Sequence, residues 1–172
     1  MVKLIGAVII LFSASMVGWQ LGKYYAYRPL QLRALLLSLR LLETEIVYGV
    51  TPLHRAFVKI GHRLPSEIGQ MFLTAAELLI TKEGLSTQSC WQSGIEKHWT
   101  STALRKDEKD VLTSLGFVLG NSDKEDQKKH LQLAITHLHS LEQEARAEQA
   151  KYEKMYKSLG FLSGLLVVIL MF

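Results

Sequence analysis

Apolar residues dominate both ends of the chain, whereas the middle mixes apolar and charged positions with a helical period. No charge occurs between Lys3 and Lys23, so residues 4–22 form a run of roughly 19 residues that spans about 28 Å as a helix. This length predicts a transmembrane helix. Aromatic and basic residues typical of a membrane interface lie near its end and directly after it: Trp19, Lys23, Tyr24, Tyr25, Tyr27 and Arg28.

A cleaved signal peptide is the alternative interpretation of the first apolar run. The small residues 13–15, Ser-Ala-Ser, would then mark the cleavage site. The run continues past that site through Met16, Val17 and Trp19, which a cleavage site does not require. The sequence therefore favours a retained helix.

A second charge-free run closes the chain at residues 158–172. Its roughly 15 residues span about 22 Å, which is short for a bilayer, but Lys154 and Lys157 can extend their amines to the interface. Gly160 and Gly164 are four residues apart, a spacing that lets two membrane helices approach closely. Ordinary membrane-helix glycines are the alternative.

Basic residues flank both apolar runs on their inner sides. The positive-inside rule therefore places the middle of the chain in the cytoplasm and both termini across the membrane. We expect three parts: a transmembrane helix with its aromatic belt (1–28), a cytoplasmic helical bundle that ends in a long stalk helix (29–157), and a C-terminal transmembrane segment (158–172). The basic residues that fix this orientation are Lys23, Arg28, Arg33, Arg146, Lys151, Lys154 and Lys157.

Pro29 is expected to kink or restart the helix, and residues 30–48 then form a helix that is apolar on two nearly opposite sides. Such a helix is either central in its bundle or offers one face to a partner. The first stripe is Leu32, Leu35, Leu39, Leu42 and Ile46, and the second is Leu30, Leu37, Leu41 and Tyr48. The charged residues between them are our candidates for partner binding: Arg33, Arg40, Glu43 and Glu45.

Turn and capping residues divide the rest of the chain into further helices. Gly49 ends the first, and Thr51 as N-cap with Pro52 at the first helical position begins the second. Helices are also expected at about 66–82, 86–99 and 104–119, and from 123 onward one helix continues to the end. Gly120 precedes this last helix, with Ser122 and Glu125 as a capping box. No strand-like alternation occurs, so the sequence predicts an all-α fold of about six helices.

Composition narrows the function without naming it. The net charge is +4, but acids are interspersed with the basic residues, which disfavours nucleic-acid binding. The single cysteine, Cys90, excludes an intrachain disulfide.

Motifs that carry catalysis are not found. There is no phosphate-binding loop, CxxC, HExxH or GxSxG. His130 and His137 share a helix face but lie about 10 Å apart, too far for one metal ion. Asp107, Glu108 and Asp110 are interpreted as a solvated helix start. We therefore expect no catalytic, cofactor-binding or metal-binding residues.

Several motifs together carry a resemblance over nearly the whole chain. They are Leu-Glu-Thr-Glu-Ile at 42–46, Gly-x-Thr-Pro-Leu at 49–53, Leu-Gly-x-x-Leu-Gly-x-Ser-Asp at 115–123, and Gln127, followed by the long helix and apolar tail. With these, the chain resembles the stage III sporulation protein AB family of endospore-forming bacteria. That family is similar to the cytoplasmic six-helix bundle of the type II secretion F platform protein.

The resemblance implies a non-enzymatic platform subunit of the channel between mother cell and forespore. The protein would lie in the mother-cell-side (outer forespore) membrane, within the lipid bilayer. It would couple a secretion-type ATPase, stage III sporulation protein AA, to the other channel subunits, and self-association into a homo-oligomer stays open. The alternative is a membrane-tethered adaptor unrelated to sporulation.

Overall fold

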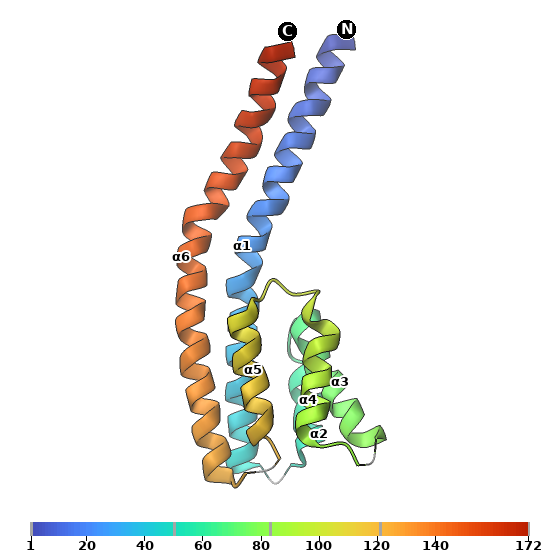
Figure 1. The fold of residues 1–172 in the computed structure, drawn as a ribbon, viewed down its shortest axis with the longest axis vertical. Coiled ribbons are helices and arrows are strands. Elements are labelled where there is room, and N and C mark those ends of the chain that lie inside the picture. The colour runs from blue at the N-terminus through green and yellow to red at the C-terminus, as the bar shows by residue number, and fades with distance from the viewer. Residues whose placement is uncertain (1, 50, 83, 121, 172) are drawn as a thin grey trace. The chain divides into compact units, whose positions relative to one another are not determined.

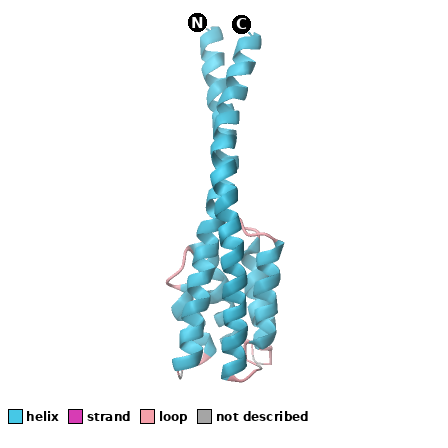
Figure 2. Cartoon of the chain, turned by 90° about the vertical axis from the view of Figure 1, so that its left-hand side faces the viewer, coloured by secondary structure: helices cyan, strands magenta, loops and turns pink. Residues whose placement is uncertain are grey.

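The computed structural model describes residues 2–49, 51–82, 84–120 and 122–171. Across these residues every assigned element is a helix (Figures 1 and 2). The helices are α1 (Val2–Tyr48), α2 (Leu53–Gly61), α3 (Ser66–Thr81), α4 (Thr87–Trp99), α5 (Lys106–Val118) and α6 (Lys124–Met171). The all-α fold and the six helices of the prediction are confirmed.

The chain forms two compact units. The terminal unit contains Met1–Pro29 and Glu144–Phe172, and the central unit contains Leu30–Gln143. The two long helices α1 and α6 each contribute to both units.

Pro29 does not restart the first helix, so this part of the expectation was wrong. The helix α1 runs through Pro29 without interruption over 47 residues. A proline removes one backbone donor and crowds the preceding turn. Here the proline itself is buried, and its neighbours Arg28 and Gln31 are only 2% and 7% exposed. Packing on both sides therefore holds the helix together where its local sequence favours a break.

The core of the central unit is built around α1 and an aromatic cluster. Leu32, Leu35, Leu39 and Leu42 have no exposed surface, as the first predicted stripe requires. Phe57 of α2, Phe72 of α3 and Trp91 of α4 bring their ring centroids within 5.1–5.6 Å of one another. The Trp91 indole also donates a 2.7 Å hydrogen bond to the Leu112 carbonyl of α5. The ring cluster thus ties α2, α3, α4 and α5 into one unit.

Two predicted helix starts differ from the structure. Pro52, not Thr51, is the N-cap residue of α2, and no side chain caps this helix. At the start of α6, the Asp123 carboxylate accepts a hydrogen bond from the Asp126 N–H at 2.8 Å. Asp123 therefore caps the N-terminus of α6, the role that we expected of Ser122 and Glu125. Aspartate is an equally good N-cap residue and lies directly before the helix.

The glycines that flank these helices differ in conformation. Gly49 follows the end of α1, and its N–H donates to the Glu45 carbonyl at 3.0 Å without a positive φ. Gly120 follows α5 with φ +84°, and a Cβ there would lie 2.5 Å from the Thr87 hydroxyl oxygen. Only glycine fits this turn without strain.

In the terminal unit, α1 and α6 approach at two glycines. A Cβ on Gly18 would lie 2.7 Å from the Tyr156 carbonyl oxygen and 2.8 Å from the Gly160 Cα. Gly164, one turn further along α6, is also buried. Tyr25 stacks on Tyr156 with ring centroids 5.5 Å apart. The helices are therefore in backbone contact, as the small residues allow.

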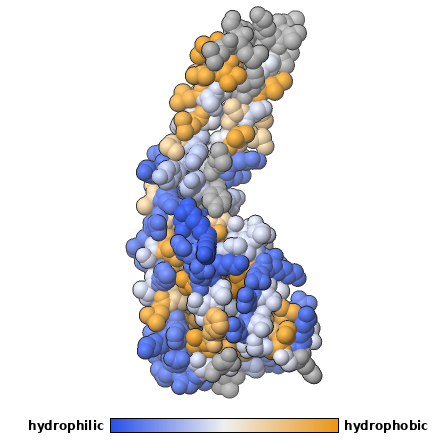
Figure 3. Space-filling view, in the orientation of Figure 1, coloured by the Kyte–Doolittle hydropathy of each residue, from blue (hydrophilic) through white to orange (hydrophobic). Residues whose placement is uncertain are grey.

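Apolar residues at every seventh position from Leu131 predict a buried stripe on α6, which is confirmed in the first part of the helix. Leu131, Leu138 and Ala145 are buried, but Leu159 is 51% exposed. Large apolar side chains also face outward on both helices of the terminal unit (Figure 3): Ile9, Phe12, Met16, Val17, Phe161, Leu162, Leu166 and Ile169. A search of the described residues nevertheless finds no helix with enough length and apolar character to cross a membrane.

Candidate docking surface

The second apolar stripe of α1 is open to solvent. Leu30 and Leu37 are 55% and 50% exposed, while leucines on the other side of the same helix are completely buried. Arg33 and Arg40 lie between and beside these leucines on the exposed side. We call these four residues the α1 stripe. The buried first stripe confirms that α1 is central on one side, and a partner on its exposed side stays a prediction.

One arginine of the α1 stripe also has a structural contact. The Arg33 Nε donates to the Glu142 carboxylate of α6 at 2.8 Å, with Arg33 52% exposed and Glu142 only 3%. Arg40 is exposed, and no ion pair of its guanidinium occurs among the contacts of the described residues. The two arginines therefore differ: Arg33 satisfies a buried carboxylate, whereas the Arg40 charge is open to a partner.

The two glutamates among the partner-binding candidates lie next to other helices. Glu43 accepts a 2.7 Å hydrogen bond from the Gln132 amide of α6. Glu45 forms an ion pair with Lys59 of α2. The hydrogen bond from Lys59 lowers the pKa of the Glu45 carboxyl below its ordinary value, although burial opposes this. Both carboxylates keep partly exposed edges at this end of α1.

A groove lies between α5 and α6 within the central unit. Its volume is about 420 Å³, and apolar side chains of both helices form its floor: Val111, Leu115, Ala134 and Leu141. Leu133, 59% exposed, stands at its edge. The charged lining consists of Asp107 and Asp110 with no lysine or arginine, and His130 and His137 complete the wall. We call this feature the α5–α6 groove.

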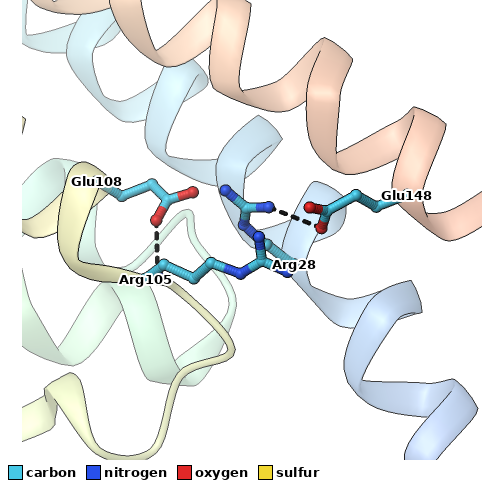
Figure 4. Close-up of polar contacts among 4 residues, drawn as sticks. All are labelled: Arg28, Arg105, Glu108 and Glu148. Carbon is cyan, nitrogen blue, oxygen red and sulfur yellow. Dashed lines mark hydrogen bonds and ion pairs between the residues drawn. The ribbon is translucent and has the colours of Figure 1, made fainter.

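The acidic residues at the start of α5 do not behave alike, which corrects our interpretation of them as a solvated cluster. Asp107 and Asp110 are exposed, but Glu108 has no exposed surface. Its carboxylate accepts the Arg105 N–H at 2.6 Å and so caps the helix (Figure 4). The signal was in the sequence, because Glu108 precedes the inward residues Val111 and Leu112 by three and four positions.

The sequence also gave no indication of a buried ion pair in the terminal unit. Arg28 of α1 donates to the Glu148 carboxylate of α6 at 3.0 Å, and the Arg28 side chain is only 3% exposed (Figure 4). The position of Arg28 after the aromatic belt predicts an interfacial residue and gives no sign of a partner on α6. The two residues are 120 positions apart, so no local pattern joins them.

Glu142 and Glu153 lie four residues before Arg146 and Lys157, a spacing that predicts ion pairs along a helix. Glu142 bonds to Arg33 across helices, as described above. Glu153 accepts from the Gln149 amide at 2.9 Å. The predicted partner of Glu153, Lys157, has a side chain outside the described set.

Among the described residues, no three His, Cys, Asp or Glu side chains are placed to hold a metal ion. Burial lowers the pKa of His98, whose imidazole is 2.9 Å from the Thr74 hydroxyl, and burial raises the pKa of the Cys90 thiol. Cys90 is buried and His98 is partly buried within the central unit.

The fold and these surfaces define a class: an all-helical protein that presents an exposed apolar and basic helix face and an acidic groove. Comparison with known proteins gives the family. The family model described as stage III sporulation protein AB (spore_III_AB) matches residues 3–172 of the chain. The chain therefore belongs to this family.

Individual relatives agree with this assignment. Stage III sporulation protein AB of Bacillus subtilis (strain 168) is 42% identical over 171 residues, 99% of either chain. A solved structure of stage III sporulation protein AB matches with a TM-score of 0.69 at 37% identity, covering 73% of this chain and 98% of that one. The resemblance found in the sequence is thereby confirmed, and the family is one of sporulation proteins.

Proposed function

We propose that the protein is a non-enzymatic platform subunit of the sporulation channel between mother cell and forespore. In this role it couples a secretion-type ATPase, stage III sporulation protein AA, to the membrane assembly. The observation that carries the proposal is the two-sided α1 helix, buried on one side and open on the other at Leu30, Leu37 and Arg40. A platform needs such a face, and membership of a sporulation family favours this role over an unrelated adaptor.

The proposal includes anchoring of both chain ends in the mother-cell-side (outer forespore) membrane. The charge-free runs at 4–22 and 158–172 of the sequence support it, and so do the outward apolar side chains of the terminal unit. Contact between Gly18 and Gly160 would let the two segments enter the bilayer as a helical hairpin. The basic residues on the inner flanks favour a cytoplasmic central unit.

Fractionation and labelling test the anchoring. We expect the full chain to stay with membranes after alkaline carbonate washing and to need detergent for release. Single cysteines placed at Lys3, on the far side of the first apolar run, and at exposed Lys129 should differ in their reaction with a thiol reagent that does not cross membranes. Recovery of the full chain in the carbonate wash contradicts the membrane part of the proposal.

The acidic end of α1 is the part of the surface that we assign to the ATPase. Glu43 and Glu45 carry negative charge beside α2 and α6, and carboxylates at a rim steer a basic partner. A pull-down with the ATPase should weaken about tenfold when both are changed to lysine, because like charges would then meet. Glu77→Lys with Glu96→Lys, at exposed sites of α3 and α4, is the matched control.

The ion pair of Glu45 with Lys59 allows a sharper arm of this experiment. Glu45→Lys combined with Lys59→Glu keeps an internal pair of the two residues and the net charge of the protein. Loss of ATPase binding in this exchange variant assigns the Glu45 charge to the partner. Unchanged binding in both the exchange and the double-lysine variant removes this end of α1 from the ATPase contact.

A further inference from the structure

The α1 stripe and the α5–α6 groove are complementary surfaces of the same unit. Two exposed leucines alternate with two arginines on α1, whereas the groove has an apolar floor and two aspartates without any basic side chain. The chain has a net charge of +4, yet the groove lining contains two aspartates and no lysine or arginine. Such a groove favours the binding of a helix face that is both basic and apolar.

The spacing of the apolar residues also agrees. Leu30 and Leu37 are two helical turns apart, about 10.5 Å along the axis. Ala134 and Leu141 in the floor of the groove have the same separation on α6, about 10.5 Å. The small Ala134 and the exposed Leu133 at the edge leave room for a leucine to enter beside them.

We propose that the α1 stripe of one copy docks in the α5–α6 groove of a second copy. Leu30 and Leu37 contact the apolar floor, and Arg40 faces Asp107 and Asp110. Since each copy offers a different surface to each neighbour, the contact is head-to-tail, and repeated addition builds a ring or an open array. The acidic end of α1 at Glu43 and Glu45 then stays available to the ATPase.

Cysteine cross-linking between two differently tagged full-length copies tests this contact without the ATPase. One copy carries Leu37→Cys and the other Leu133→Cys, both at exposed positions that tolerate substitution. Native Cys90 stays in place, because it is buried and its pKa is raised, which keeps the thiol unreactive. We expect a disulfide-linked dimer that contains both tags, in membranes and after purification in detergent.

The like pairs are the controls. Leu37→Cys with itself and Leu133→Cys with itself should give little product, because these positions do not meet in a head-to-tail contact. Product from a like pair alone would show a symmetric dimer and overturn the proposal. Absence of any mixed dimer also overturns the proposal. The same holds if the Leu133→Cys copy cross-links only to a different protein, because that protein would then be the occupant of the groove.

Charge exchange identifies the polar part of the contact. Asp107→Lys with Asp110→Lys in the groove copy should lower the mixed product about tenfold, as should Arg40→Asp in the stripe copy, because like charges then meet. The three changes together, distributed over the two copies, should restore most of the product. Lys129→Asp, close to the groove but outside its lining, is the matched control and should have little effect. Equal yields in all variants would contradict the assignment of these charges.

Discussion

Arg33 and Glu142 form an asymmetric pair: the guanidinium is half exposed, and the carboxylate that it meets at 2.8 Å is buried. The buried partner determines the energetic consequence, because a buried carboxylate that loses a donor is penalised more than an exposed arginine that loses an acceptor. Exposure alone would place Arg33 and Arg40 in one group, whereas their contacts separate them.

The first prediction follows from this difference. We expect Arg33→Ala to lower the free energy of unfolding of the full chain by about 1–2 kcal/mol, since Glu142 loses a charged hydrogen bond. Arg40→Ala, about two helical turns further along α1 and at a side chain with no described ion pair, should change it by less than about 0.5 kcal/mol. Thermal unfolding in detergent measures both. Equal losses would mean that the Arg33 contact contributes nothing.

The second prediction concerns the glycine contact of the terminal unit. Gly18→Ala places a Cβ against the backbone of Tyr156 and Gly160, which cannot move without separating the helices. We expect a loss of about 1–3 kcal/mol, typical of overpacking. Gly6 in the same helix is the control, because a Cβ there meets nothing within 4 Å.

The two alanine variants are compared by thermal unfolding and by the near-ultraviolet circular dichroism of the stacked Tyr25 and Tyr156. Gly18→Ala should weaken this signal, and Gly6→Ala should leave it unchanged. A Gly18→Ala protein with the unfolding temperature and spectrum of the native chain would show that the two helices are not held together at this glycine.

The periodicity of apolar residues was sufficient to predict the helices. It was not sufficient at positions where tertiary packing opposes the local preference of the sequence. The buried stripe at Leu32, Leu35 and Leu39 was predicted because a 3.6-residue repeat determines which side chains share a face. Pro29 was misjudged because its effect on a helix depends on what surrounds the helix, and here the surroundings are a packed interior.

The candidate docking surface was also predictable from the sequence only in part. The second stripe at Leu30 and Leu37 was visible in the sequence, but only the structure shows that no element of the described chain covers it. The α5–α6 groove could not be predicted, because it depends on how two separate helices pack. The Asp123 cap was missed for a local reason: Ser122 and Glu125 match a motif, while the adjacent aspartate performs the same function one residue later.

The third prediction is a pH effect at the Glu45–Lys59 pair. Lys59 lowers the pKa of Glu45 in the folded chain below its ordinary 4.5, so the unfolded chain binds the proton more readily. The pair therefore contributes its full stabilisation above pH 4.5 and loses it as the pH falls through the lowered pKa. The unfolding temperature of Lys59→Met should lie below that of the native chain at pH 6, and this gap should close under acidic conditions.

Two comparisons make the pH effect specific. Lys129→Met removes an exposed lysine of α6, and its small offset from the native chain should not depend on pH in this range. High salt should reduce the gap at pH 6, because the pair is near the surface and is screened. A gap for Lys59→Met that is constant from pH 6 to pH 3 would contradict the assignment.

The fourth prediction separates backbone strain from steric contact at two glycines of the central unit. Gly84 and Gly120 have φ angles of +92° and +84°, so alanine at either is strained by about 1 kcal/mol. A Cβ at Gly84 meets nothing within 4 Å, whereas at Gly120 it would lie 2.5 Å from the Thr87 hydroxyl oxygen and 2.9 Å from the Thr87 Cβ. Thr87 is the first residue of α4, so it cannot move away without moving that helix.

We expect Gly84→Ala to lower the free energy of unfolding by about 1 kcal/mol and Gly120→Ala by about 2–3 kcal/mol, as measured by thermal unfolding. Thr87→Ala in the Gly120→Ala background should recover part of the difference, because it removes the Thr87 hydroxyl oxygen, the atom closest to the new Cβ. Equal costs at the two glycines would show that strain alone, without the contact between the α5–α6 connection and α4, determines the choice of glycine at position 120.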